Sequence, residues 1–148
     1  MYLIDKDKIT DLLNFIEKRQ SQFDEVITCQ GNIGDLARER YAEVLIASIL
    51  DVGHLLIDGF MMRDAGSYED IICILVDEQV IPEAERSALI GFISMRAMLM
   101  RSYDVLDAEE VLKALLSAKE SLQRFPLHIR TYLKKEANVA HAFGKKSD

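Results

Sequence analysis

Apolar residues recur three and four positions apart along most of the chain, which is the spacing of one face of an α-helix. Strand-like alternation is nearly absent, and two prolines and seven glycines supply the few breaks in the pattern. A first helix is predicted from about residue 5 to 26, and a second, the longest, from about residue 33 to 62. The apolar stripe of the second helix is wide, which indicates burial on more than one side.

Two local signals predict the next two helices. Ser67 followed by Asp70 is a variant capping box, and it predicts a short third helix that ends near residue 79. Pro82 suits the first position of a fourth helix, because a helix needs no amide donor there. This fourth helix is predicted to end near residue 103.

A second capping-box pattern, Asp107 with Glu110, predicts the start of a fifth helix. Pro126 is predicted to kink or break that helix, because its ring removes a donor and clashes with the preceding turn. The stretch "LHIRTYLKKEANVAHAF" then continues as a last helix, and "GKKSD" is expected to fray. Whether the segment after Pro126 packs on the other helices or reaches for a partner stays open.

The predicted fold class is therefore all-α, an up-and-down bundle of four to five helices. A chain of 148 residues suits one domain, spanning 1–148, with a core over about 5–136 and a flexible tail over 144–148. The sequence reaches charged residues within its first five positions and has no apolar run long enough for a membrane span. Together with two cysteines that lack any ligand spacing, Cys29 and Cys73, this predicts a soluble, cytoplasmic protein with free thiols and no membrane partner.

Charge and motif content exclude several functions. Acidic side chains outnumber basic ones by 25 to 18, a net charge of −7, which is unfavourable for general nucleic-acid binding but compatible with a local basic groove. The segment "GNIG" lacks the Lys and Ser/Thr of a phosphate loop. The histidines, His54, His128 and His141, show no metal-ligand spacing, so no metal and no cofactor is expected.

One segment, "SMRAMLMRSYDVLDAEEV", places charged and aromatic groups at the end of an apolar helix. Arg96 and Tyr103 are seven residues apart, so both are predicted to project from one helix face. Arg101 is turned away from Arg96 on an ideal helix, and a cation there also complements the helix dipole. The ordinary explanation for Arg96 is an ion pair with an acid on another helix, for which Asp51 is a natural candidate.

These residues resemble the signature of the HEPN superfamily, and within it the HepT-like toxins, which are partners of minimal nucleotidyltransferases. The resemblance covers most of the chain, from "RERYAEVLIASILDVGHLLI" through "RDAGSYEDIICILVDEQVIP" to the segment above. The family signature is an Arg, often followed by Asn, then four residues from that Arg to a His, one further residue and a Tyr. Arg96 and Tyr103 match with the spacing kept, whereas Ala97 replaces the Asn and Arg101 replaces the His.

The resemblance implies that Arg96 would hold a phosphate and that a histidine would transfer the proton during metal-independent RNA cleavage. An arginine stays protonated near neutral pH, so Arg101 cannot take over that proton transfer. Arg96, Arg101 and Arg40 are the candidate RNA or phosphate ligands. Two further residues of the second helix, Asp51 and His54, are expected to line the same groove.

Tyr103 matches the tyrosine that, in HepT-like proteins, the partner nucleotidyltransferase modifies with AMP. Sequence reasoning leaves two environments open for it: an accessible phenol at a helix end, or a half-buried ring capping the core. The same resemblance implies a homodimer in which the motif arginines of two chains share a cleft. The second helix and methionines 95, 98 and 100 offer more apolar surface than one small bundle needs to bury, which gives modest support for a dimer. Burial in the core of a single chain explains such residues as well.

Three functional hypotheses follow. The first is a HepT-like protein of a toxin–antitoxin type system with a lost or weakened RNase centre, acting by dimerisation and by binding a partner or RNA. The second is an active metal-independent endoribonuclease toxin with Arg96 and Tyr103 as catalytic residues, silenced by AMPylation of the tyrosine. The third is a purely structural helical interaction protein.

Overall fold

The computed structural model describes the backbone of residues 4–147 and the side chains of residues 4–139. Within that part, every regular element is a helix, which confirms the all-α prediction. A 3₁₀ turn precedes α5 at Glu83–Glu85, and another follows it at Tyr103–Val105. The six α-helices are α1 (Lys6–Gln20), α2 (Phe23–Thr28), α3 (Gly31–Gly59), α4 (Tyr68–Asp77), α5 (Arg86–Arg101) and α6 (Ala108–Ser147).

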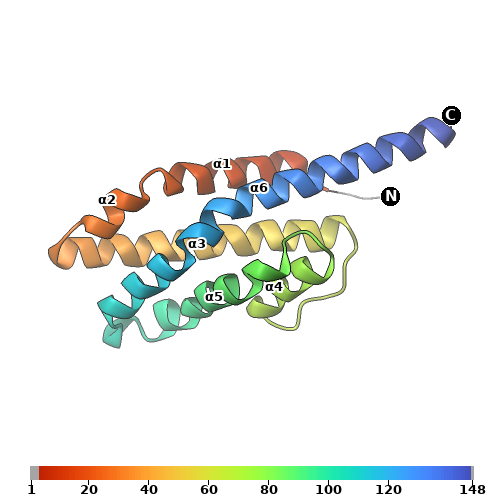
Figure 1. Ribbon diagram of the computed structural model, residues 1–148. Coiled ribbons are helices and arrows are strands. Elements are labelled where there is room, and N and C mark those ends of the chain that lie inside the picture. The colour runs from red at the N-terminus through yellow and green to blue at the C-terminus, as the bar shows by residue number, and fades with distance from the viewer. Residues whose placement is uncertain (1–3, 148) are drawn as a thin grey trace.

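Helix α3 is the central element, and it contacts all five other helices. Helix α1 lies on one side of α3 and helices α4 and α5 on the other, and α6 crosses α3 from the side of α5 to the side of α1 (Figure 1). The apolar faces of these helices meet in one core, whose largest fully buried side chains include Phe92, Phe125, Leu45, Ile49 and Leu56. No helix within residues 4–147 is long and apolar enough to cross a membrane.

The first predicted helix, about residues 5–26, is wrong in one respect, because the structure divides it into α1 and α2. The carbonyl of Arg19 would accept from the amide of residue 23 in a continuous helix. It instead accepts from the Gln22 amide at 2.9 Å and from the Tyr41 hydroxyl at 2.7 Å. The Ser21 hydroxyl also donates to the Lys18 carbonyl, a local bond that competes with the helical pattern.

The wide apolar stripe predicted for the second helix lies mostly in the core. Helix α3 begins and ends within three residues of the predicted bounds, and its side chains at Leu45, Ile49, Val52 and Leu56 are fully buried. Among the large apolar side chains of α3, Ile33 and Leu36 are exposed. Most of the apparent apolar excess is therefore explained by burial within one chain.

Ser67 caps α4 as predicted, because its hydroxyl accepts from the Asp70 amide at 3.0 Å. The predicted role of Pro82 is wrong. It precedes the 3₁₀ turn, and α5 itself begins at Arg86. The Glu85 amide bonds to the Pro82 carbonyl three residues back, which tightens the chain into a 3₁₀ turn before the α-helix starts.

Helix α6 starts where the sequence predicted. The Asp107 carboxylate accepts from the Glu109 amide at 2.9 Å, which satisfies one of the free donors at the helix start. Glu110 bonds to Asp107 through its backbone amide, which donates to the Asp107 carbonyl, and its side chain does not complete a capping box. The helix then continues to Ser147, so it includes residues 144–147 of the expected tail. The flexibility of that segment stays a prediction.

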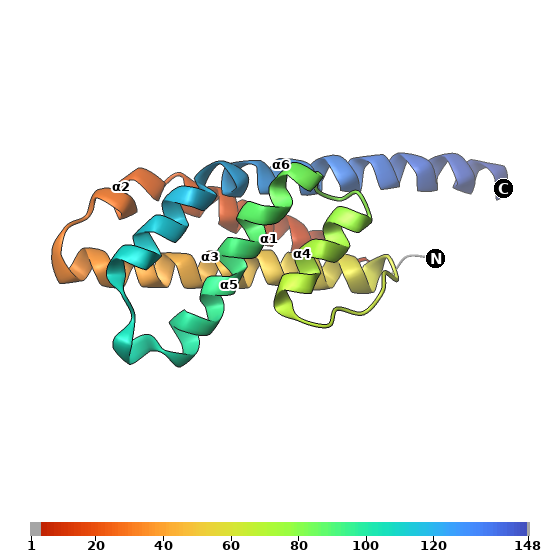
Figure 2. The same ribbon diagram turned by 60° about the horizontal axis from the view of Figure 1, so that its bottom comes forward.

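Pro126 does not break α6, which runs through it. Proline has no amide to donate to the carbonyl four residues back, which is that of Leu122. The Gln20 side-chain amide of α1 bonds to this carbonyl instead, so the freed acceptor is satisfied from outside the helix. The first part of α6, in cyan, and its second part, in blue, run in different directions, as expected for a helix bent at proline (Figure 2).

The segment after Pro126 both packs on the bundle and extends past it. Ile129 is fully buried, and Tyr132 and Leu133 pack against the core. Beyond them the backbone of α6 projects past the other helices in both views (Figures 1 and 2).

Candidate functional site around Arg96

Arg96 lies in the last third of α5, where it is half-buried. Its guanidinium carbon is 4.2 Å from the centroid of the Tyr68 ring, the geometry of a cation–π contact. The expected ion pair with Asp51 is wrong, because no carboxylate within residues 4–139 pairs with Arg96. A small pocket of about 130 Å³ adjoins the arginine, lined by Glu43, Ile46, Ala47, Arg96, Leu99 and Met100.

The backbone around Tyr68 is fixed by local hydrogen bonds. Tyr68 is the first residue of α4, directly after the capping Ser67, and 44% of its surface is exposed. The Asp70 carboxylate, two positions on, accepts hydrogen bonds from both terminal nitrogens of Arg63, at 2.7 and 2.9 Å, and from the Gly66 amide at 2.9 Å. The hydrogen bonds from Arg63 are the main reason why the pKa of the Asp70 carboxyl falls to about 2. This carboxylate therefore ties the α3–α4 loop to the start of α4.

Arg40 on α3 does not line this pocket, and instead lines a separate one together with Phe15 and Arg19 of α1. Its guanidinium is exposed and pairs with the Glu43 carboxylate at 3.5 Å. Since Glu43 also lines the pocket beside Arg96, it sits between the two arginines. Sequence reasoning missed Glu43, although it lies three residues after Arg40 at the spacing of a helical ion pair.

Asp51 and His54 follow Ala47 on the exposed face of α3, at helical spacings of four and three residues. His54 is seven residues beyond Ala47, which places it about 10 Å further along the helix axis. Neither residue lines the pocket beside Arg96. The structure therefore gives no support to their predicted place in the groove, although both share its helix face.

The predicted common face of Arg96 and Tyr103 rested on helical spacing, which does not apply because α5 ends between them, so that face stays a prediction. Helix α5 stops at Arg101, and Ser102 has φ −111° and ψ 30°, outside the helical range. Tyr103 then begins a 3₁₀ turn and is 70% exposed, which agrees with an accessible phenol and not with a half-buried ring. Arg101 is exposed in the last turn, where its charge complements the helix dipole.

The arginines differ in how their charge is compensated. Six of the nine form an ion pair with a carboxylate: Arg38, Arg40, Arg63, Arg86, Arg124 and Arg130. Within residues 4–139, Arg96, Arg101 and Arg19 have no such partner. Arg19 instead stacks on Phe15 at 4.7 Å. The two motif arginines thus keep an uncompensated positive charge on a chain whose net charge is −7.

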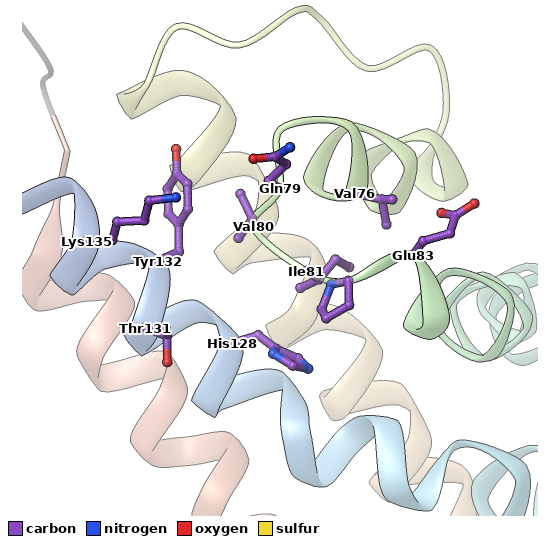
Figure 3. A pocket seen from close by; sticks show the side chains of 10 residues that line it. Val76, Gln79, Val80, Ile81, Glu83, His128, Thr131, Tyr132 and Lys135 are labelled. Carbon is purple, nitrogen blue, oxygen red and sulfur yellow. The ribbon is translucent and has the colours of Figure 1, made fainter.

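A larger pocket, of about 460 Å³, lies elsewhere and includes none of the motif residues. Figure 3 shows His128, Tyr132 and Lys135 on α6 facing the loop that carries Gln79 and Val80. The His128 side chain is paired with a buried carboxylate, since its Nε2 lies 3.1 Å from a carboxylate oxygen of Glu85.

Glu85 is the most buried carboxylate of this region, with 3% of its surface exposed. It accepts two hydrogen bonds from Arg124, at 2.8 and 2.7 Å, and one from the Ser121 hydroxyl at 3.1 Å. The Arg124 guanidinium is the main reason why the pKa of the Glu85 carboxyl falls to about 2, against the opposing effect of burial. This cluster joins the start of α5 to α6, and we interpret it as structural.

Comparison with known proteins agrees with this arrangement of helices. The sequence model of the family described as ribonuclease HepT-like matches residues 6–129. The YutE protein of Bacillus subtilis, whose name describes a proposed RNase, is 42% identical over 143 residues, covering 97% of this chain and 99% of that protein. The solved structure of B. subtilis YutE, described as a cytosolic protein of unknown function, superposes with a TM-score of 0.85 at 41% identity, covering 92% of this chain and 95% of YutE.

A more distant solved structure shares the fold. The AMPylated HEPN toxin of Shewanella oneidensis, in complex with its MNT antitoxin, superposes with a TM-score of 0.75 at 14% identity. The match covers 86% of this chain and 99% of that toxin. The bundle is thus of the HEPN type. The chain belongs to the ribonuclease HepT-like family, as the match over residues 6–129 shows.

Proposed function

We propose that this chain is a HepT-like protein of a toxin–antitoxin type system whose RNase centre is lost or weakened, and which acts by dimerising and by binding a partner or RNA. The observation that carries the proposal is the uncompensated charge of Arg96 and Arg101 in a chain where six other arginines are paired. A guanidinium without a carboxylate partner is free to bind a phosphate, because no bound anion has to be displaced.

The chemistry of Arg101 supports the loss of cleavage. In the family signature a histidine occupies this position, and a positioned proton-transfer group contributes about 10²–10⁴-fold in rate. Arg101 remains protonated and cannot exchange a proton near neutral pH. The residues that line the pocket beside Arg96 include no histidine to replace it.

A cleavage assay with the purified chain tests this proposal. A quenched fluorescent RNA is incubated with the wild type in the presence of a chelator, and little cleavage is expected. Arg101→His is expected to raise the rate because it restores a proton carrier at the signature position, whereas Arg101→Ala removes the charge without adding one. Rapid metal-independent cleavage by the wild type that Arg96→Ala abolishes would show that the centre is intact.

An accessible tyrosine supports a nucleotidyltransferase partner. Tyr103 is 70% exposed, as a modifying enzyme would require. The Shewanella oneidensis toxin described above was solved AMPylated and bound to its MNT antitoxin. Incubating this chain with ATP and the product of a neighbouring nucleotidyltransferase gene should add the mass of AMP. Tyr103→Phe should prevent that gain, and an unchanged gain would place the modification elsewhere.

Dimerisation has more limited support. Of the three methionines considered above, Met100 is exposed, whereas Met95 packs against the core. Met100 lines the same pocket as Arg96, so a second chain covering it would bring two arginines toward a shared cleft. The mass in solution at micromolar concentration tests this arrangement, and a monomer would contradict it.

The second candidate function is an active endoribonuclease toxin silenced by AMPylation. The specific observation in its favour is the RNase name of the 42% identical YutE protein. Here Arg96 and Tyr103 would be the catalytic residues. The cleavage assay above separates this candidate from the first, since it requires turnover by the unmodified wild type.

A further inference from the structure

We propose that Tyr68 is a positioning residue for Arg96, holding its guanidinium against the ring so that its N–H donors face an anionic phosphate. This inference rests on the proposed function, since it concerns how the same arginine binds a phosphate group. Tyr68 lies 28 positions before Arg96 and is outside the signature segment. The juxtaposition arises because α4 packs beside α5 and places its first residue next to the last third of α5 (Figure 2).

The geometry of the stack is suited to this role. A guanidinium is planar, and its five N–H donors lie in its plane. The Tyr68 ring, whose centroid is 4.2 Å from the guanidinium carbon, restrains the side chain without a carboxylate that would accept hydrogen bonds from these donors. A carboxylate partner would restrain Arg96 too, but it would occupy the donors and neutralise the charge. Arg40 shows that second arrangement, with its donor on Glu43 at 3.5 Å.

The backbone that carries the ring is held by local hydrogen bonds. Ser67 caps the helix that Tyr68 begins, and Asp70 binds the Gly66 amide and both terminal nitrogens of Arg63. Asp70 is thus bonded through its carboxylate to Gly66 and through its amide to Ser67, so these bonds span the backbone of Tyr68. Holding a ligand group in advance reduces the entropy that binding has to offset. A ring on this backbone, with 44% of the residue's surface exposed, can restrain Arg96 and still leave the site open to solvent.

A double-mutant cycle on phosphate-ligand affinity tests whether the ring acts through the arginine. The probe is a short fluorescein-labelled oligouridine, measured by anisotropy with wild type, Tyr68→Leu, Arg96→Gln and the double variant. A cation–π contact at a partly exposed site corresponds to about a twofold to fivefold change in affinity. Tyr68→Leu is expected to weaken binding by that factor, and Tyr68→Phe is expected to retain it. Arg130→Gln, an exposed arginine paired with Glu17, controls for the general loss of positive charge.

The decisive result is the behaviour of Tyr68→Leu when Arg96 is already changed. If Tyr68 acts through Arg96, the second substitution has no further effect on affinity. Equal weakening in both backgrounds overturns the proposal, because the ring would then contact RNA independently. Binding by the wild type that depends on Arg96 but not on Tyr68 overturns it as well, and leaves the proposed function standing.

Titration with inorganic phosphate separates the two proposals when the oligouridine does not bind. The NMR signal of the Arg96 Nε–H group is expected to show a ring-current shift that Tyr68→Phe keeps and Tyr68→Leu removes. Phosphate should perturb this signal in the wild type and less in Tyr68→Leu. That result supports the positioning role even if RNA binding fails, whereas a signal without ring-current shift or without any response to phosphate overturns it.

Discussion

Replacing Glu85 with glutamine tests how strongly its buried cluster joins the start of α5 to α6. The substitution keeps the size of the side chain but removes the charge that accepts two hydrogen bonds from Arg124 and one from Ser121. His128 also loses its carboxylate partner. Since Glu85 is 3% exposed, its surroundings cannot replace these bonds with water.

The pKa of Glu85 gives the size and the sign of the effect. Its carboxyl has an ordinary pKa of 4.5 and a pKa of about 2 in the folded chain. At 1.36 kcal/mol per unit, this depression corresponds to about 3 kcal/mol of stabilisation at neutral pH. A lowered pKa stabilises the fold fully above pH 4.5, and the contribution is lost as the pH falls toward about 2. Because the Arg124 side chain is 46% exposed and can be rehydrated, we expect the variant to lose about 2 kcal/mol.

Urea unfolding at neutral pH and near pH 3 measures this effect on the free energy of unfolding. The difference between wild type and Glu85→Gln should fall by more than half at the lower pH, because the wild type has then lost most of the contribution. Glu120→Gln is the matched control, since its 81% exposed carboxylate lies 3.8 Å from the same arginine. A loss no larger than that of Glu120→Gln, or a loss equal at both pH values, would refute the assignment of the stabilisation to Glu85.

Four further substitutions test the fold. Ser67→Ala removes the α4 cap and should lower the free energy of unfolding by about 1 kcal/mol, and an unchanged urea midpoint would contradict the cap. Gly53→Ala should cost about 1–3 kcal/mol, because its new Cβ would lie 2.4 Å from Ile71 Cγ2. The Cβ of Gly91→Ala would meet no atom within 4 Å, so this substitution should instead stabilise α5 by up to about 1 kcal/mol. Equal changes in stability for Gly53→Ala and Gly91→Ala would argue against close packing at Gly53. Tyr41→Phe removes the hydroxyl bond to the end of α1 and should cost about 1 kcal/mol in thermal or urea unfolding, and no loss would show that this bond does not fix the helix end.

The helices could be predicted because their existence depends on local periodicity. The long apolar stripe of α3 and the cap at Ser67 are properties of neighbouring residues, and both appear in the structure as expected. The errors occur where a distant side chain changes the backbone bonding. Tyr41 takes the carbonyl that would have continued α1, and Gln20 takes the carbonyl that Pro126 leaves free in α6. Neither bond has a signal in the local sequence.

The sequence singled out candidate site residues but did not predict what surrounds them. Arg96 and Tyr103 stood out as polar groups in an apolar segment, and the resemblance to the HepT-like signature named them. Helical spacing does not apply to Tyr103, because α5 ends before that residue. Charge complementarity suggested Asp51 as the partner of Arg96, whereas the structure provides the ring of Tyr68. Tyr68 and Arg96 are far apart in the sequence, and only the packing of α4 beside α5 brings them together, so the local sequence does not predict their contact.

The choice of a ring over a carboxylate has an electrostatic consequence for the whole molecule. The net charge of −7 repels a polyanion at long range, so any phosphate ligand must be attracted locally. An arginine already paired with a carboxylate contributes little to that attraction, because its charge is compensated at short range. Arg96 keeps its full charge while an aromatic ring limits its motion, and Arg101 keeps its charge at the exposed helix end. The same lack of carboxylates also means that these two positions contribute little ion-pair energy to folding, so their charge is more readily explained by binding than by stability.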